Sequence, residues 1–95
     1  MLLQYEEHTL KGGDFINLKE AIANRINYLC TERKLNPSSL AYLCGMDRST
    51  IYSILGSKSK SPEVATIKKI CDGLEITLGE FFSSPEFDAL EQEIK

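Results

Sequence analysis

The stretch between residues 36 and 55 limits most strongly what this chain can fold into, because it carries start and stop signals for two short helices. Asn36 can cap a helix in which Pro37, at the first position, needs no amide hydrogen bond and already has a suitable φ. Gly45 fits the left-handed position that ends such a helix, and Asp47 is placed to accept hydrogen bonds from the amides that open the next one. The sequence therefore predicts two short helices joined by a tight turn.

Both predicted helices have one apolar face. In the first, Leu40, Leu43 and Cys44 share a face. In the second, a step of roughly 100° per residue separates apolar from polar side chains. The apolar side carries Ile51, Ile54 and Leu55, and the other side carries Arg48, Ser49, Tyr52 and Ser53. Ala41 is small where the helices must approach, and Ile51 fills the angle between them, so the pattern indicates a helix-turn-helix.

A family resemblance follows from this motif and its surroundings. The residues that carry it are Leu35, Asn36, Leu40, Ala41, Cys44, Gly45, Arg48, Ser49, Thr50, Ile51, Ile54, Pro62 and Ile67. They resemble the Cro/CI-type (XRE-like, lambda-repressor-like) helix-turn-helix family of phage repressors and bacterial regulators, over about residues 18–82. The resemblance implies an all-α fold: a five-helix lambda-repressor-like DNA-binding domain, here with an additional C-terminal helix. A generic helical bundle is the alternative.

The helix-turn-helix domain is expected to span residues 17–82, after an N-terminal arm over residues 1–16 that is either a strand or disordered. Asn17 and Glu20 have the spacing of a capping box, which predicts a first helix to about Lys34. Cations on the outer face of this helix either follow a phosphate backbone or simply face water. These cations are Lys19, Arg25 and Arg33.

Beyond the motif, residues 56–61 form a polar loop, and Ser61 and Pro62 are expected to start a fourth helix. Thr77 and Glu80 form a second capping box, which predicts a short fifth helix. Glu75 stands where the family usually has glycine, which implies a different turn after the fourth helix.

Residues 83–95 are expected to form an amphipathic helix that Ser84 and Pro85 open. Its apolar stripe consists of Phe87, Leu90 and Ile94. The stripe either joins two copies of the chain as a dimerisation element or folds back over Phe81 and Phe82.

The charge distribution fits nucleic-acid binding better than the net charge does. The chain carries a net charge of −3, which by itself opposes binding to phosphate. However, residues 18–72 hold nine Lys or Arg against five Asp or Glu, a net charge of +4, and both ends of the chain are acidic. The basic part coincides with the motif and its supporting helices.

Other function classes lack the residues that they need. The three cysteines, Cys30, Cys44 and Cys71, are far apart in sequence and fall on apolar helix faces, so we expect buried, reduced thiols and no metal site. His8 has no catalytic companion, and the serines have no evident base. We therefore expect no enzyme activity, no cofactor and no small-molecule ligand. Without a long apolar run or a basic leader, the chain is expected to be cytoplasmic and not bound to a membrane.

The resemblance implies contacts to DNA from two groups of residues. Contacts to base edges in the major groove are expected from Arg48, Ser49 and Ser53, of which Arg48 can donate two hydrogen bonds to guanine. Contacts to the DNA backbone are expected from Ser38, Ser39, Thr50, Tyr52, Lys58 and Lys60. Pro37 stands where many family members carry a phosphate-contacting glutamine, which weakens the expected contact to phosphate at the start of the first motif helix.

The sequence thus predicts a transcriptional regulator that binds double-stranded DNA sequence-specifically as a homodimer, with a recognition helix at about residues 47–55. The alternative is a protein-interaction module, such as an antitoxin-like partner, that uses the same bundle. Salt dependence distinguishes them, because only phosphate contacts weaken steeply with added salt.

Overall fold

The computed structural model describes residues 17–56 and 61–91 of the 95-residue chain. The predicted N-terminal arm over residues 1–16 lies outside the described residues. So do two of the expected DNA-backbone contacts, Lys58 and Lys60, and Ile94 of the apolar stripe.

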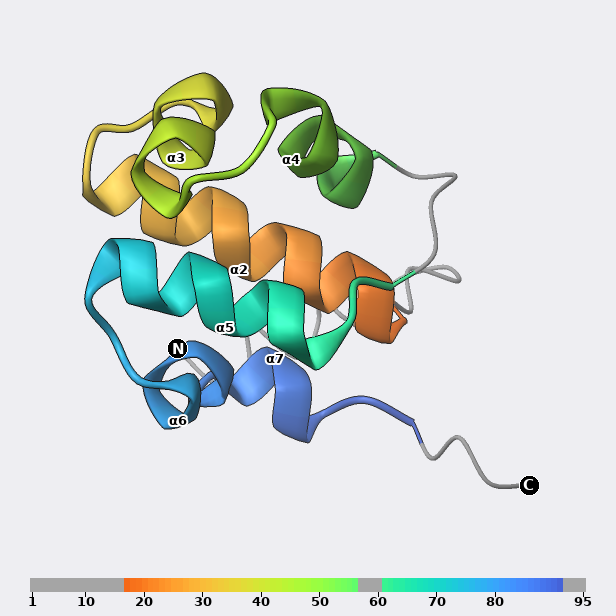
Figure 1. Ribbon diagram of the computed structural model, residues 1–95. Coiled ribbons are helices and arrows are strands. Elements are labelled where there is room, and N and C mark those ends of the chain that lie inside the picture. The colour runs from red at the N-terminus through yellow and green to blue at the C-terminus, as the bar shows by residue number, and fades with distance from the viewer. Residues whose placement is uncertain (1–16, 57–60, 92–95) are drawn as a thin grey trace.

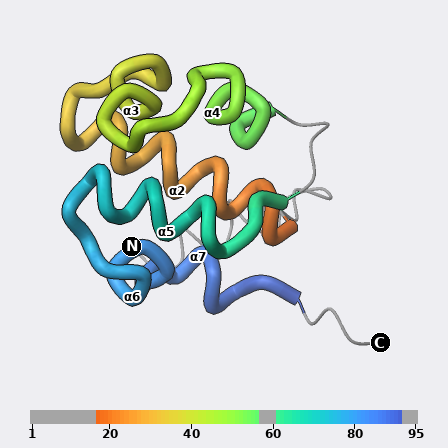
Figure 2. The backbone as a smooth tube through the Cα atoms, in the orientation of Figure 1, coloured from red at the N-terminus to blue at the C-terminus, as the bar shows by residue number. Residues whose placement is uncertain are grey.

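The described residues form six helices and no strand. They are α2 (Leu18–Glu32), α3 (Pro37–Cys44), α4 (Arg48–Leu55), α5 (Val64–Leu74), α6 (Leu78–Phe82) and α7 (Pro85–Asp88). In Figure 1, α2 and α5 cross the middle of the molecule, α3 and α4 cover one side, and α6 and α7 lie on the other. The tube in Figure 2 shows the same arrangement. The predicted all-α fold, with five helices and an additional C-terminal helix, is confirmed for the described residues.

Helix ends marked by local signals lie where the sequence predicts them. At Asn17 and at Thr77 the side chain accepts from the backbone amide three residues on, and that residue's glutamate accepts in return, so both capping boxes are present. Asn36 caps α3 by accepting from the Ser39 amide at 2.8 Å. Gly45 ends α3 in the left-handed conformation, with φ 67°. Each of these helix ends is determined by residues within a few positions of it in the sequence.

Two predicted caps are wrong. Asp47 is the N-cap residue of α4, but its side chain makes no capping hydrogen bond. The fourth helix does not start at Pro62: α5 begins at Val64 after Glu63, whose extended backbone carbonyl accepts the first hydrogen bonds, from the Thr66 and Ile67 amides. Extended backbone at Glu63 therefore displaces the start of the helix.

The turn after α5 also departs from its prediction. Glu75 adopts the left-handed conformation, with φ 60°, that glycine usually takes at this position. The Ile76 amide donates to the Cys71 carbonyl at 2.9 Å and the Glu75 amide donates to Asp72, which is the pattern of a left-handed helix end. The expected different turn is wrong, because these hydrogen bonds hold Glu75 in a conformation that it would not choose by itself.

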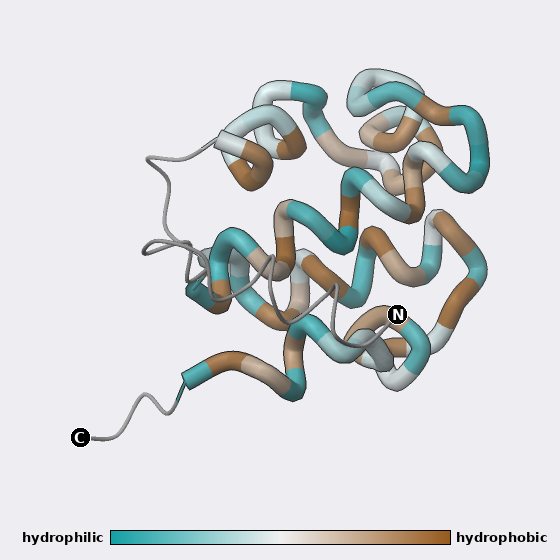
Figure 3. The backbone as a smooth tube through the Cα atoms, turned by 180° about the vertical axis from the view of Figure 1, so that it is seen from behind, coloured by the Kyte–Doolittle hydropathy of each residue, from teal (hydrophilic) through white to brown (hydrophobic). Residues whose placement is uncertain are grey.

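The core lies between α2 and α5 and is closed by the other helices. Its largest fully buried side chains are Phe81, Ile26, Leu40, Ile51, Ile67, Ile70, Leu74 and Cys71. Figure 3 shows hydrophobic and hydrophilic residues alternating along the helices, as expected when each helix has one buried face. In α3 the buried residues are Leu40 and Ala41, whereas Leu43 is 50% exposed, so its predicted inward orientation is wrong.

The cysteines are free thiols with a packing role. Cys30 and Cys71 are buried and Cys44 is partly buried. Burial raises the pKa of all three thiols, which keeps them protonated and unreactive at neutral pH. Among the described residues, no group of three or more His, Cys, Asp or Glu could hold a metal ion.

The C-terminal helix is shorter than predicted. α7 ends at Asp88, so the described residues do not form a helix that carries both Phe87 and Leu90. Phe87 packs inside the chain, with its ring centroid 5.0 Å from that of Phe82 and 6.2 Å from that of Phe81. A helix of four residues has little stability of its own, so the aromatic contact decides where it lies.

We predict that Gly73→Ala destabilises the protein, although alanine is normally the better helix former by about 1 kcal/mol. A Cβ at this position would lie 2.6 Å from Sγ and 3.1 Å from Cα of Cys44, where α3 packs on α5. Separating the helices should lower the free energy of unfolding by about 1–3 kcal/mol, measured by urea denaturation.

Gly79→Ala is the matched control, because a Cβ there would meet only Thr77 Oγ1 at 3.7 Å. It should be neutral or stabilising. Equal effects of the two substitutions would show that the contact between α3 and α5 tolerates an added methyl group.

Candidate nucleic-acid interface

The turn between α3 and α4 has the geometry of a helix-turn-helix. At Gly45 the chain closes the end of α3 with two hydrogen bonds: the Gly45 amide donates to Tyr42 and the Met46 amide donates to Ala41, at 3.2 and 2.9 Å. Ala41 and Ile51 are both buried where the two helices pack together. The small side chain of Ala41 lets the helices approach, and Ile51 anchors α4 to the core.

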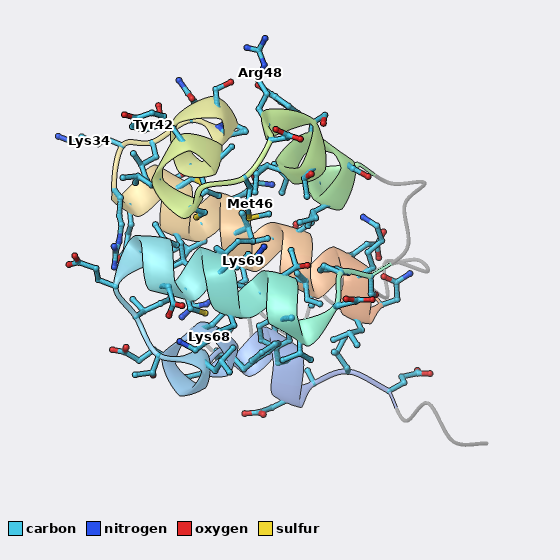
Figure 4. The ribbon with its side chains drawn as sticks, in the orientation of Figure 1. Lys34, Tyr42, Met46, Arg48, Lys68 and Lys69 are labelled. Atoms are coloured by element: carbon cyan, nitrogen blue, oxygen red, sulfur yellow. The ribbon has the colours of Figure 1, made fainter. Side chains whose placement is uncertain are left out.

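One face of α4 is anchored in the core and the other is exposed. Ile51 and Ile54 are buried, and Leu55 packs against the core at the end of the helix. All the predicted contact residues of α4 are exposed: Arg48, Ser49, Thr50, Tyr52 and Ser53. Figure 4 shows Arg48 extending away from the bundle at the start of α4. The exposed face of α4 thus carries hydroxyl groups and one guanidinium, and the buried face fixes the helix to the core.

The start of α3 presents fewer groups for contacts to phosphate than predicted. Ser38 and Ser39 are only partly exposed, and the Ser39 amide is already used by the Asn36 cap. Pro37 has no amide hydrogen to donate. The groups that this end could offer to a phosphate are therefore the Ser38 amide and the hydroxyl groups of the two serines.

Two cations of α2, Lys19 and Arg25, and Arg33, which follows that helix, have a structural role that sequence reasoning missed. Arg25 donates from Nε and Nη2 to the Phe81 and Glu80 carbonyls at the end of α6, each at 2.7 Å. Arg33 Nη1 donates to the Leu74 carbonyl at the end of α5. Lys19 Nζ donates to the Ile54 and Gly56 carbonyls at the end of α4.

These hydrogen bonds give the cations a role within the protein that neither expectation, contact with a phosphate backbone or exposure to water, included. A helix end leaves carbonyls without amide partners and has a partial negative charge, which a cation from another helix can satisfy. The last turns of α4, α5 and α6 contain no basic residue of their own. That absence was the one available signal, but it could not say which distant side chain would supply the charge.

Tyr42 is another feature of this surface. It is 87% exposed, so it does not cover the core, and Leu43 beside it is 50% exposed. In Figure 4 Tyr42 lies on the α3 side of the molecule, as does Lys34. The outward part of α3 is thus apolar and aromatic, unlike the polar face of α4.

Acidic residues collect on the opposite side of the bundle. Glu80, Glu86 and Asp88 belong to α6 and α7, which Figure 1 places across the molecule from α3 and α4. Negative charge repels DNA, so this arrangement leaves α3 and α4 as the side that a duplex can approach.

A cavity of about 420 Å³ lies between α2 and the segment that joins α6 to α7. Its polar walls are engaged within the protein: Asn24 donates to Glu86 at 3.1 Å, and Arg25 holds the end of α6. No described helix is long and apolar enough to cross a membrane.

Comparisons with known proteins agree with this geometry. Residues 25–86 match the family model of the Cro/C1-type HTH DNA-binding domain. The fold is similar to the crystal structure of the prophage Lp1 protein 11, with a TM-score of 0.70 and 28% identity, covering 78% of this chain and 97% of that one. It is also similar to an HTH_3 family transcriptional regulator from Vibrio cholerae, with a TM-score of 0.64 and 32% identity.

That second likeness covers 72% of this chain and 38% of the regulator, so the chain spans well under half of the regulator's length. No curated protein sequence matches this chain.

Proposed function

Because the chain belongs to the Cro/C1-type helix-turn-helix DNA-binding family, we propose that it is a transcriptional regulator that reads a specific sequence in the major groove of double-stranded DNA with α4. The single observation that carries this proposal is the division of α4 into two faces. Buried Ile51 and Ile54 fix the helix, while Arg48 and its polar neighbours face outward. A fixed helix with an exposed polar face suits the major groove.

The proposed contacts to bases come from Arg48, Ser49 and Ser53. Arg48 can donate two parallel hydrogen bonds to O6 and N7 of a guanine, which makes it the main source of discrimination. Serine hydroxyls accept from or donate to any base, so they contribute to affinity more than to discrimination between sequences.

The proposed contacts to phosphate and sugar hold α4 in register on the duplex and carry no sequence information directly. Tyr52, 52% exposed, can place its hydroxyl against the backbone. The other proposed backbone contacts are Ser38, Ser39, Thr50, Lys58 and Lys60.

We propose that two copies act together on DNA. One small domain makes few base contacts, and two recognition helices about 34 Å apart would reach successive major grooves on one face of the duplex. Phe87 packs on Phe81 and Phe82 of its own chain but stays partly exposed, and an interface between copies that includes Phe87, Leu90 and Ile94 remains part of this proposal. A titration against duplexes with one or two selected half-sites gives the stoichiometry.

Selection of bound duplexes from a random pool tests the proposal. The expected result is enrichment of one motif, with binding that weakens steeply as salt is raised, because phosphate contacts release counterions. The competing function, an antitoxin-like interaction module, draws support from the exposed Tyr42 and Leu43. Recovery of unselected sequences, with no salt-dependent binding, would favour that function and contradict ours.

A further inference from the structure

The end of α4 is held by a side chain from a different helix. The last turn of α4 has no basic residue, and Gly56, which follows it, is extended, with φ −76° and ψ 150°. Lys19 reaches this point from the first turn of α2. Its Nζ donates to the Ile54 carbonyl at 2.8 Å and also to the Gly56 carbonyl. One ammonium group therefore binds the last turn of α4 and the residue that follows it.

These hydrogen bonds from Lys19 matter for α4 because the helix has only eight residues. Isolated helices of that length are unstable in water, so the packing of α4 and its tertiary hydrogen bonds determine where it lies. Ile51 and Ile54 fix one face against the core, but apolar contacts are not directional. Hydrogen bonds from a partly buried ammonium are stronger and directional, and they fix how far the end of α4 can turn or shift.

We infer that Lys19 is a positioning residue, which holds α4 in the orientation at which Arg48 and its neighbours meet base edges; this inference rests on the proposed function. Hydrogen bonds to bases need accurate placement of both partners, whereas contacts to phosphate tolerate more displacement. Loss of the hydrogen bonds from Lys19 should therefore reduce discrimination between DNA sequences more than it reduces affinity for DNA in general.

The chain contains a matched control for this inference. Arg33, the residue that follows α2, donates to the Leu74 carbonyl at the end of α5 in the same way. α5 carries none of the proposed base contacts. Removing Arg33 therefore removes the same kind of bond between a cation and a helix end, without releasing α4.

The experiment compares Lys19→Met, Lys19→Arg and Arg33→Met with the wild type, on the selected duplex and on a random duplex at one salt concentration. All are measured at a temperature at which circular dichroism shows them folded. We expect Lys19→Met to reduce the ratio of specific to non-specific affinity about tenfold, the order of losing one base contact. Arg33→Met should change that ratio by less than about twofold, and Lys19→Arg, which keeps the donor and the charge, should largely restore it.

The inference is overturned if Lys19→Met discriminates as the wild type does, or if Arg33→Met loses as much discrimination. If Lys19→Met does not fold, Lys19→Gln, which keeps one donor, is measured in its place against the same two limits. A wild type without preference for the selected duplex would contradict the proposed function itself, and that result is obtained before any variant is compared.

Discussion

Replacing Phe81 with alanine is expected to lower the free energy of unfolding by about 3–5 kcal/mol. Phe81 is the largest fully buried side chain and packs against both Phe82 and Phe87. The substitution removes its contacts with the core and also the surface on which α7 rests. The cavity cannot collapse easily, because the Phe81 carbonyl is held by Arg25. Urea denaturation followed by circular dichroism measures the loss.

Tyr42→Ala is the control, since it also truncates an aromatic side chain on a helix but at a position that is 87% exposed. It should change the free energy of unfolding by less than about 0.5 kcal/mol. A loss below about 1 kcal/mol for Phe81→Ala would contradict a core closed by α6.

Arg48→Ala is expected to weaken binding to the selected duplex by about 1–3 kcal/mol and to relax the choice at one base pair. Stability should not change, because the Arg48 side chain is exposed and extends from the bundle in Figure 4. Lost hydrogen bonds to guanine reduce specific binding, while the phosphate contacts that support binding to any duplex are kept. Fluorescence anisotropy with duplexes that vary at each position of the motif measures both effects.

Lys68→Ala is the charge-matched control for Arg48. Lys68 lies on α5 and pairs with Asp72, also on α5, so it should contribute only a general electrostatic effect. If Arg48→Ala weakens selected and random duplexes equally, Arg48 contacts the DNA backbone and a different residue supplies the discrimination.

Most of the fold could be predicted because its boundaries depend on residues close together in sequence. Asn17, Asn36, Gly45 and Thr77 each act within a few residues, and all four end or begin a helix as predicted. The faces of α4 also follow from local periodicity, since burial of Ile51 and Ile54 needs only a core to lie against. Local chemistry was sufficient at these positions, although the caps that it predicted at Asp47 and Ser61 are wrong.

The failures arise where contacts of the folded chain, near or far in the sequence, outweigh the local preference of a residue. Glu75 takes a glycine-like conformation because surrounding hydrogen bonds hold it there. Phe87 packs on the aromatic side chains of α6 and does not continue an amphipathic helix. Lys19, Arg25 and Arg33 bind carbonyls 35 to 56 residues away, and no periodicity reveals such partners.

In the candidate site too, local sequence predicts some features and the packing of the folded chain determines others. Exposure of the polar residues of α4 follows from the helical period, so Arg48, Ser49 and Ser53 could be named before their geometry was known. The partial burial of Ser38 and Ser39 depends on how α3 packs, and the sequence alone does not determine it.

Backbone amide chemical shifts, followed by NMR while the selected duplex is added, test the central claim most directly. The account predicts that the largest changes fall on α4 between Arg48 and Ser53 and at the start of α3, with α6 and α7 little affected. The largest changes at α6 and α7, or no localised change on addition of the selected duplex, would contradict recognition by α4.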